Sequence, residues 1–466
     1  MSTERHKPRQ GRRRQERSSA YDLICRLDRQ YVWHPCTQMK DHEVQPPIPI
    51  VRGKGPFLYD ARGRRYIDGI SSWWVNLLGH AHPRLTRALR EQAGTLEHVI
   101  FAGCTHEPGA RLAAELCRIA PGTFSKVFYA DCGSAAVEVA LKMSFQYWQQ
   151  TGQARKRKFA ALRGAYHGET LGALSVGGIG LYRKVYRPLL LKTFNVDGPD
   201  CYRCPFGKAR ASCGAECFAP LGRVLEAHGA EIAAVFIEPM VQCANGMNMY
   251  NAAYLRKLRR ACTRHGVHLV ADEIAVGFGR TGRMFACEHA GIAPDFLCVS
   301  KGLTGGYMPF AAVLTGEEVF AAFYGEQRAQ TAFYHSHSYT GNPMACRLAL
   351  ETIAILEQEA LPALPGKCRV LGRALARCAG LKHVGETRQS GYIGAIELVS
   401  ERRTKRRFPA AARVGWEVCR AALRRGALLR PLGDVLYFML PLTTPDSVVE
   451  HLAEITCEAI KEVTER

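Results

Sequence analysis

The feature that most constrains the fold is a series of short apolar runs between about residues 126 and 316. Each run is apolar on consecutive positions, which is typical of strands covered on both faces. Helical segments, over 134–150 and 252–265 among others, lie between several of the runs. The pattern predicts an α/β fold with a mainly parallel central sheet covered by helices. The runs are KVFYADCGS, KFAALRGAYHG, AAVFIEP, HLVADE, DFLCVSKG and PFAAVLTG.

The flanking segments predict a second, smaller α+β domain built from both ends of the chain. Residues 51–70 are typical of a hairpin that turns at Asp60 to Gly63. After about residue 345 a long helix is expected, followed by antiparallel strands in GYIGAIELV and ALLRPLGDVLYFMLPL. The expected parts are a tail (1–20), the N-terminal part of the small domain (21–75), a large domain (76–344) and the C-terminal part of the small domain (345–466).

The 466 residues carry a formal net charge of +21, which raises the question of a nucleic-acid partner. Much of the charge lies in Arg12-Arg13-Arg14 and in RRTKRR, residues 402–407, without interleaved aromatic residues. We interpret both clusters as solvated surface charge, and residues 1–20 as a disordered basic tail. No specific nucleic-acid partner and no membrane contact are expected. The 18 cysteines, mostly single within apolar segments, favour reduced thiols in the cytoplasm.

Two polar residues at strand ends indicate chemistry. Asp272 ends the run HLVAD, and Lys301 follows the run DFLCV 29 residues later. One crossover joins the two runs, so both side chains can reach the same edge of the sheet. A lysine and an aspartate so placed suit pyridoxal phosphate, because the lysine bonds to the aldehyde and the acid keeps the pyridine nitrogen protonated. The alternative for Asp272 is a strand-end acid that caps a turn or pairs with Arg280.

The same cofactor needs a phosphate cradle and a cover for its ring. Gly133 and Ser134 lie between a strand and a helix, where backbone N–H groups and the helix dipole favour an anion. Ser134 could instead serve only as a helix N-cap. Tyr166, in the segment Ala-Tyr-His-Gly that ends the next strand, is the candidate for the ring, although packing is the alternative.

Six motifs in order resemble the class III pyridoxal-phosphate aminotransferases, and the resemblance runs from about residue 30 to the C-terminus. It implies the type I aminotransferase fold and a homodimer with its active site at the subunit interface. The motifs are GSAAVEVALKM, AYHGETLGALS, FIEP, ADEIAVGFGRTG, SKGLTGG and HSYTGNPMAC.

The resemblance also implies roles for individual residues. Lys301 is similar to the lysine that bonds to the cofactor and moves the proton at the substrate carbon. Asp272 is similar to the partner of the pyridine nitrogen, and Tyr166 to the stacking aromatic residue. Gly133 and Ser134 resemble the phosphate-binding turn, and Ser338 resembles the hydroxyl that reaches the phosphate from the other subunit.

Further segments resemble the branch of this family that acts in biotin biosynthesis. That branch transfers an amino group from S-adenosylmethionine to 8-amino-7-oxononanoate, giving 7,8-diaminononanoate through pyridoxamine phosphate. Arg430 resembles the arginine that binds the acceptor carboxylate, for which a guanidinium fork is suited. The remaining substrate contacts that the resemblance implies are Trp73, Trp74, Tyr437, Gly302, Arg280 and Cys36. The segments are VWHPCTQM, DGISSWWVNLLGHAHP, FAGCTHEP, MFACEHAGIAPD and GALLRPLGDVLYFMLP.

The amino donor stays open at this point. Cys36 replaces the tyrosine of well-known members and the phenylalanine of lysine-using relatives, so the donor is S-adenosylmethionine or lysine. The segment 239–245 has no acid. That counts against an ω-amino-acid enzyme of the ornithine type, but another class III ω-amino-acid or diamine aminotransferase remains an alternative.

A cysteine-rich insertion over 198–220 is a separate feature. Four thiolates with this spacing could hold a structural zinc ion or, as a second choice, an iron–sulfur cluster. The alternative is an inserted loop with free thiols. The histidines His34, His80, His82 and His106 are interpreted as loop and capping residues. The candidate metal ligands are Cys201, Cys204, Cys213 and Cys217.

Overall fold

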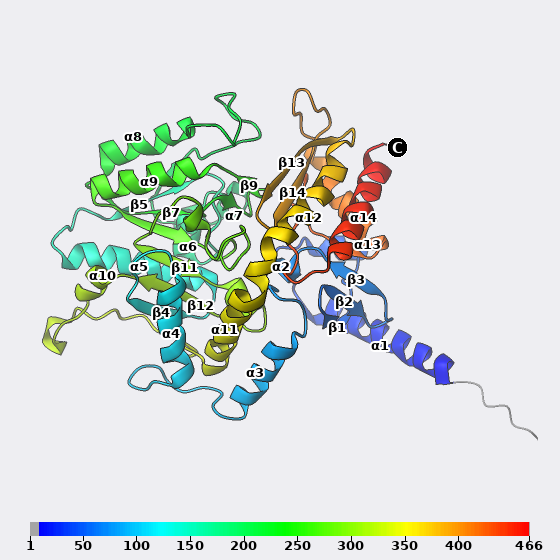
Figure 1. Ribbon diagram of the computed structural model, residues 1–466, viewed down its shortest axis with the longest axis horizontal. Helices are drawn as coiled ribbons and strands as arrows, with labels where there is room; N and C mark the ends of the chain where they lie inside the picture. The colour runs from blue at the N-terminus through cyan, green and yellow to red at the C-terminus, as the bar shows by residue number, and fades with distance from the viewer. Residues whose placement is uncertain (1–8, 466) are drawn as a thin grey trace, which may run out of the picture.

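A seven-stranded sheet forms the centre of the larger lobe in the computed structural model, which describes residues 9–465 (Figure 1). The strand order is β4-β12-β11-β10-β7-β5-β6. Strand β12 is antiparallel to both neighbours, and the other neighbouring pairs are parallel. The prediction of a mainly parallel sheet is therefore confirmed. The strands are β4 Lys126–Ala130, β5 Lys158–Leu162, β6 Phe194–Val196, β7 Ile232–Ile237, β10 His268–Asp272, β11 Phe296–Val299 and β12 Ala311–Thr315.

Both faces of this sheet are buried, which explains the continuous apolar runs. On β10, Val270 packs in one cluster with residues of α5 (Gly133–Gln150), such as Val137. Its neighbour Leu269 packs in the other cluster with residues of α9 (Ala252–His265), such as Leu258. Alternate side chains of one strand thus meet helices on opposite faces.

The smaller lobe joins the two ends of the chain (Figure 1). One of its sheets has the order β1-β2-β3-β15, and the other has the order β13-β14-β16. The predicted turn at Asp60 to Gly63 joins β2 to β3, and the Gly63 N–H donates to the Asp60 carbonyl. The strands are β1 Ile50–Lys54, β2 Phe57–Asp60, β3 Arg65–Asp68, β13 Val384–Ser390, β14 Ile393–Leu398, β15 Ala427–Leu428 and β16 Val435–Phe438.

One strand direction differs from the prediction. Strands β14 and β16 are antiparallel as expected, but β15 runs parallel to β3, with Ala427 opposite Ile67. The reason is that β15 follows α13 (Val414–Arg424), and a helical crossover permits a parallel neighbour where a hairpin does not. The long helix expected after residue 345 corresponds to two helices, α11 (Pro343–Ile355) and α12 (Leu361–Ala379). A π-helical segment, Leu356–Ala360, joins them.

The expectation of a disordered tail over residues 1–20 is wrong from Arg9 onward, because α1 spans Arg9–Tyr31. Arginine, glutamine and glutamate are good helix formers, and they dominate this segment despite its charge. Residues 1–8 lie outside the described part of the chain. No helix in the described part is long and apolar enough to span a bilayer.

The remaining elements are short or peripheral. They include η1 Met39–Glu43, α2 Ser71–Trp74, α3 Pro83–Ala93, α4 Glu107–Ile119, α6 Leu171–Val176, α7 Gly180–Arg183, α8 Ala219–His228, β8 Val241–Gln242, β9 Asn248–Met249, η5 Lys301–Thr304, α10 Glu317–Ala321 and α14 Asp446–Thr464. As interpreted, His106 caps a helix: its ring accepts from the Gly109 N–H at the start of α4.

Candidate active site

Asp272 and Lys301 lie at the same edge of the central sheet, as their spacing predicts. Strands β10 and β11 are parallel neighbours, with Asp272 opposite Cys298, and Lys301 follows the end of β11. Both residues line a cavity of about 410 Å³. Cavities of this size hold small molecules and cofactors. The site therefore has a volume and a position at the strand ends that suit a ligand of an α/β sheet.

The partner of Asp272 is His167 and not Arg280. The Nδ1 of His167 lies 2.7 Å from Oδ2 of Asp272, and both side chains are buried. Burial by itself lowers the pKa of His167, but the hydrogen bond and charge of Asp272 outweigh it and raise that pKa. The other oxygen, Oδ1, accepts from the Ile274 N–H at 3.0 Å. Sequence reasoning did not assign His167 a role, although it stands next to Tyr166 in the quoted motif.

Lys301 is half-buried and lines the same cavity as this carboxylate group. Its Nζ lies 4.7 Å from the ring centroid of Trp74, and its backbone φ of 46° is in the left-handed region. Burial lowers the pKa of Lys301, against the opposing charge of Asp272. Desolvation of this kind favours the neutral amine, which is the nucleophilic form. A strained backbone at such a residue is typical of functional sites.

The start of α5 forms a tight turn beside the cavity. Cys132 is the N-cap and makes no side-chain capping bond, so the alternative of an N-cap by Ser134 is wrong. The Ser134 hydroxyl instead lies 2.8 Å from Oγ1 of Thr170 and accepts from the Thr170 N–H. The first N–H groups of α5 are therefore available to an anion, as a phosphate site requires.

Tyr166 lines the same cavity and is held by two glutamates. Its hydroxyl donates to Oε1 of Glu169 at 3.2 Å, and its backbone N–H donates to Oε2 of Glu238 at 2.9 Å. Glu238 also accepts from the Cys243 N–H, and burial raises the pKa of Glu238 to about 7. Glu238 is a second residue that sequence reasoning did not assign, although FIEP places it directly after β7.

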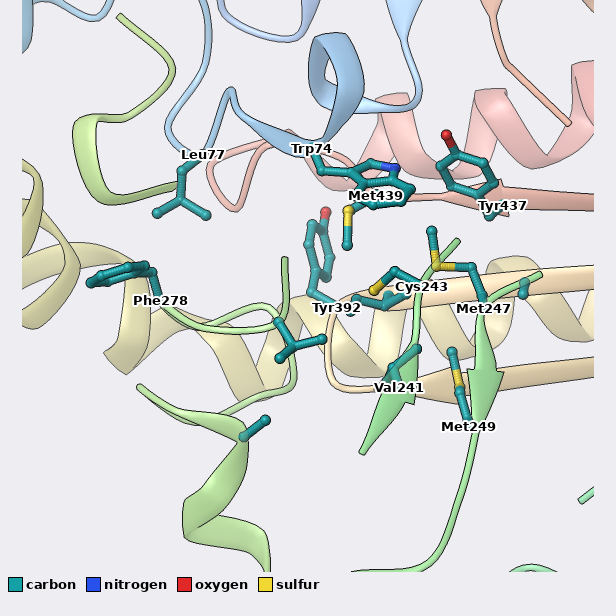
Figure 2. Packing of buried hydrophobic residues seen from close by; sticks show 14 of the residues in the cluster. Trp74, Leu77, Val241, Cys243, Met247, Met249, Phe278, Tyr392, Tyr437 and Met439 are labelled. Carbon is teal, nitrogen blue, oxygen red and sulfur yellow. The ribbon is translucent and has the colours of Figure 1, made fainter. Parts of the chain in front are cut away.

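The two adjacent tryptophans have different environments. Trp74 is buried, lines the cavity and meets Tyr437 edge to face, with ring centroids 6.1 Å apart (Figure 2). Trp73 is 39% exposed, and the guanidinium carbon of Arg430 lies 4.6 Å from its ring centroid. Consecutive positive φ angles over residues 71–74 send the two side chains in different directions.

Cys36 connects Arg430 to the cavity. The Nη2 of Arg430 donates to the Cys36 carbonyl at 3.3 Å, and the Cys36 thiol donates to Oε1 of Glu169 at 3.8 Å. Glu169 lines the cavity, whereas Cys36 and Arg430 line a neighbouring cavity of about 380 Å³. The structure thus places a guanidinium with an aromatic face next to the chamber that contains Lys301.

Two predicted substrate contacts, Arg280 and Gly302, are absent from the cavity lining, and their roles stay predictions. Arg280 is buried and donates to the backbone carbonyls of Trp74, Asn76 and Leu440, so it supports the chain that carries Trp74. Gly302 is buried against Leu77 and does not line the cavity. Gly302 directly follows Lys301 and Arg280 lies in the segment after Asp272, and periodicity does not show on which side of the backbone a side chain lies.

No three of the predicted metal ligands in the cysteine-rich insertion bring their sulfur atoms within 4.8 Å of one another. In the described chain, the one group of three ligand atoms within 4.8 Å of one another is Asp28, His34 and His42. Cys201 and Cys217 pack against the apolar core, and burial raises the pKa of Cys201 to about 12 and that of Cys217 to about 11. Cys213 donates to the Arg210 carbonyl. Cys204, the fourth predicted ligand, is likewise a free, half-buried cysteine, so zinc at this insertion is not supported.

A larger cavity of about 820 Å³ lies between this insertion and the small-domain sheets, and neither Lys301 nor Asp272 lines it. Ser338, the residue expected to reach the phosphate of a partner subunit, is exposed in the chain. Its role stays a prediction.

Comparison with known proteins identifies the family. The model of the family described as Aminotransferase class-III matches residues 38–463. The chain belongs to the class III aminotransferase family. It is 45% identical over 439 residues to the adenosylmethionine-8-amino-7-oxononanoate aminotransferase of Geobacter sulfurreducens, covering 94% of this chain and 97% of the relative. The relative of the same name in Aquifex aeolicus is 41% identical, with 94% and 96% covered.

Solved structures agree with this assignment. An adenosylmethionine-8-amino-7-oxononanoate aminotransferase from Methanocaldococcus jannaschii has a TM-score of 0.90 at 36% identity, covering 95% of this chain and 99% of that chain. An omega transaminase from Pseudomonas jessenii in complex with PMP has the same TM-score at 30% identity, covering 95% and 98%. The predicted type I aminotransferase fold is therefore confirmed.

Proposed function

We propose that this class III aminotransferase transfers an amino group from S-adenosylmethionine to 8-amino-7-oxononanoate, giving 7,8-diaminononanoate in biotin biosynthesis. Relatives at 41–45% identity over almost the whole chain have this activity in their names. The observation that carries the proposal is the stack of Arg430 on Trp73 beside the chamber that contains Lys301. A cavity that contains the Lys301 amine and has Arg430 beside it suits a substrate that carries a ketone and, some distance along its chain, a carboxylate.

Class III aminotransferases are pyridoxal-phosphate enzymes, and the residues present fit this cofactor. Asp272, held by His167, would keep the ring nitrogen protonated, and Tyr166 would cover the ring. The N-terminus of α5 with Ser134 would hold the phosphate. The buried carboxylate–imidazole pair that lines the cavity is the observation that supports this fit. Once bound, the cofactor supplies an electron sink for the charge that develops on the substrate carbon.

Lys301 has two roles in this proposal. Its amine holds the cofactor before the substrate arrives, and afterwards it moves a proton at the substrate carbon. Burial supports both roles because it lowers the pKa of Lys301 and thereby raises the fraction of neutral amine near neutral pH. The contact with the Trp74 ring limits the positions that the amine can reach.

Arg430 would bind the acceptor carboxylate with two parallel hydrogen bonds, and Trp73 holds the guanidinium plane in place. Trp74 and Tyr437 offer apolar walls for the aliphatic chain. This arrangement orients the acceptor by its far end while the ketone enters the chamber.

The donor is proposed from the relatives, with lysine as the alternative. The Pseudomonas omega transaminase shares the fold at the same TM-score, so the fold alone does not separate an ω-amino-acid enzyme from this one. Cys36, at the junction of the two cavities, is neither of the aromatic residues associated with the two donors. The distinction therefore needs a donor assay.

The proposal includes a homodimer with Ser338 donated across the interface, a cytoplasmic location, and the division into parts at residues 75 and 344. The cysteines that stand singly within apolar segments support a reducing compartment. The parallel pair of β3 with β15 supports one small domain built from both ends of the chain.

The test follows the cofactor absorbance through the two half-reactions. The yellow protein is mixed separately with S-adenosylmethionine, lysine and 4-aminobutyrate, and 8-amino-7-oxononanoate is then added to each bleached sample. Bleaching by S-adenosylmethionine followed by return of the colour supports the proposal. Bleaching by lysine alone keeps the acceptor and changes the donor. Failure of the acceptor to restore the colour in every sample overturns the substrate assignment.

A further inference from the structure

A group of three side chains outside the active site has the composition of a metal site. Asp28 lies in the last turns of α1, His34 in the loop that follows, and His42 in η1. One ligand atom of each lies within 4.8 Å of the other two. The Nε2 of His34 is 3.0 and 3.1 Å from the two carboxylate oxygens of Asp28. The rings of His34 and His42 meet edge to face at 4.7 Å.

An ordinary hydrogen-bonded pair of aspartate and histidine explains only part of this geometry. Such a pair needs one imidazole, whereas the second imidazole here also brings a ring nitrogen to the same point. All three side chains are half-buried, so solvent and ions can reach them while their positions stay restricted.

The ligand set indicates which ion would bind. Two imidazoles and one carboxylate suit divalent zinc, cobalt, nickel or copper, whereas magnesium and calcium prefer oxygen ligands. Three protein ligands leave a fourth position for water in a tetrahedral site. Tetrahedral ligands lie roughly 3.3 Å apart when each is about 2.0 Å from the ion, so donor atoms within 4.8 Å of one another can close around one ion after a small movement of the side chains.

The surroundings connect this group to the active site. Asp41, next to His42, forms a two-point ion pair with Arg413 at 3.0 and 2.8 Å. Cys36, between His34 and His42, accepts from Arg430 through its carbonyl. An ion bound by the three side chains would therefore fasten α1 to the segment that contains Cys36, which contacts Arg430 beside the active site.

We propose that Asp28, His34 and His42 bind one divalent transition-metal ion of the zinc class, which fastens α1 to the loop over residues 32–42. The ion has a structural role and takes no part in amino transfer. The inference does not depend on the identity of the amino donor or acceptor.

The experiment uses the tag-free, full-length chain loaded with pyridoxal phosphate. Bound zinc is measured by equilibrium dialysis against ZnCl₂ with elemental analysis, in wild type and in His42→Ala and Asp28→Asn. His451→Ala is the matched control, because His451 also lies beside a carboxylate, that of Glu454, on an exposed helix face. Cys204→Ser is the control for zinc held by the cysteine-rich insertion.

We expect one zinc ion per wild-type chain. Because each variant removes a ligand, its affinity should fall by at least the roughly 10–100-fold that loss of an outer-shell partner costs. Both controls should bind as wild type does, and zinc should raise the thermal midpoint of wild type but not of the two variants. Asp28→Asn keeps the side-chain size, so it decides the result if circular dichroism shows that His42→Ala is misfolded. Absence of zinc from wild type, wild-type affinity in Asp28→Asn, or loss of binding in Cys204→Ser overturns the proposal.

Discussion

The turn at Gly168 offers the most direct test of the phosphate cradle. Gly168 has φ +122°, and a Cβ atom built there lies 2.3 Å from Oγ and 2.8 Å from Cα of Ser134. The Cα atom belongs to the backbone of α5, so rotation of a side chain does not relieve the contact. Gly168→Ala must therefore push the start of α5 away, and with it the group of N–H donors proposed to hold the phosphate.

The size of the effect follows from two contributions. A residue with a side chain in such a sparsely populated backbone region costs about 1–3 kcal/mol. Overpacking against Ser134 costs about another 1–3 kcal/mol. The second contribution falls on the cofactor site itself, and 1–3 kcal/mol corresponds to roughly 5- to 150-fold weaker binding of pyridoxal phosphate.

Gly152→Ala is the matched control. Gly152 also has a positive φ, +78°, but a Cβ there has nothing within 4 Å. This variant should lose about 1–2 kcal/mol through backbone strain alone and keep its cofactor affinity. Titration of pyridoxal phosphate into each apoprotein, followed by absorbance, measures the affinities, and thermal midpoints measure the strain. Equal cofactor affinity in Gly168→Ala and Gly152→Ala would refute the assignment of this turn.

Three further predictions concern single side chains. Lys301→Ala should leave the circular dichroism spectrum intact and lower turnover by at least the roughly 10²–10⁴-fold that a positioned acid–base group contributes; a misfolded variant would contradict this separation. Arg430→Ala should raise the acceptor KM by roughly 10- to 150-fold, from the 1.5–3 kcal/mol of a charged hydrogen bond, and spare the donor half-reaction; an equal loss in both halves argues against a carboxylate contact. Burial raises the pKa of Glu273 to about 7 from the model-peptide 4.5, so the folded state binds this proton more tightly than the unfolded state. The contribution of this proton to the free energy of unfolding is fully present below pH 4.5, and on the order of 3 kcal/mol is lost as the pH rises through about 7. Glu273→Gln should flatten this decline when the free energy of unfolding is measured with urea at several pH values. An unchanged dependence on pH would refute the burial argument.

Much of the site could be predicted because its residues stand at strand ends. An apolar run that stops at Asp272 and another that stops before Lys301 place both at one edge of a parallel sheet, and the structure has them there. Tyr166 and Ser134 also line the cavity as expected. These positions depend on local burial, which sequence periodicity reports directly.

Side-chain contacts that join distant segments could not be predicted. Arg280 was expected near substrate, but its guanidinium lies under the carbonyls of Trp74 and Leu440, which belong to both ends of the chain. The four cysteines at 201–217 have the spacing of metal ligands, yet two of their sulfurs pack against the core. Spacing limits how close residues can come, whereas packing decides whether their side chains converge.

The sequence by itself determined six of the seven strands of the central sheet, because burial on both faces of a sheet imposes apolar runs, and its motifs determined the family. The three-residue strand β6 (Phe194–Val196) was not predicted. The tertiary structure alone decided that His167 is the partner of Asp272, that Arg430 stacks on Trp73, and that Asp28, His34 and His42 converge. The physical reason is that these contacts depend on the direction of side chains between segments whose relative placement is set by the packing of the whole core.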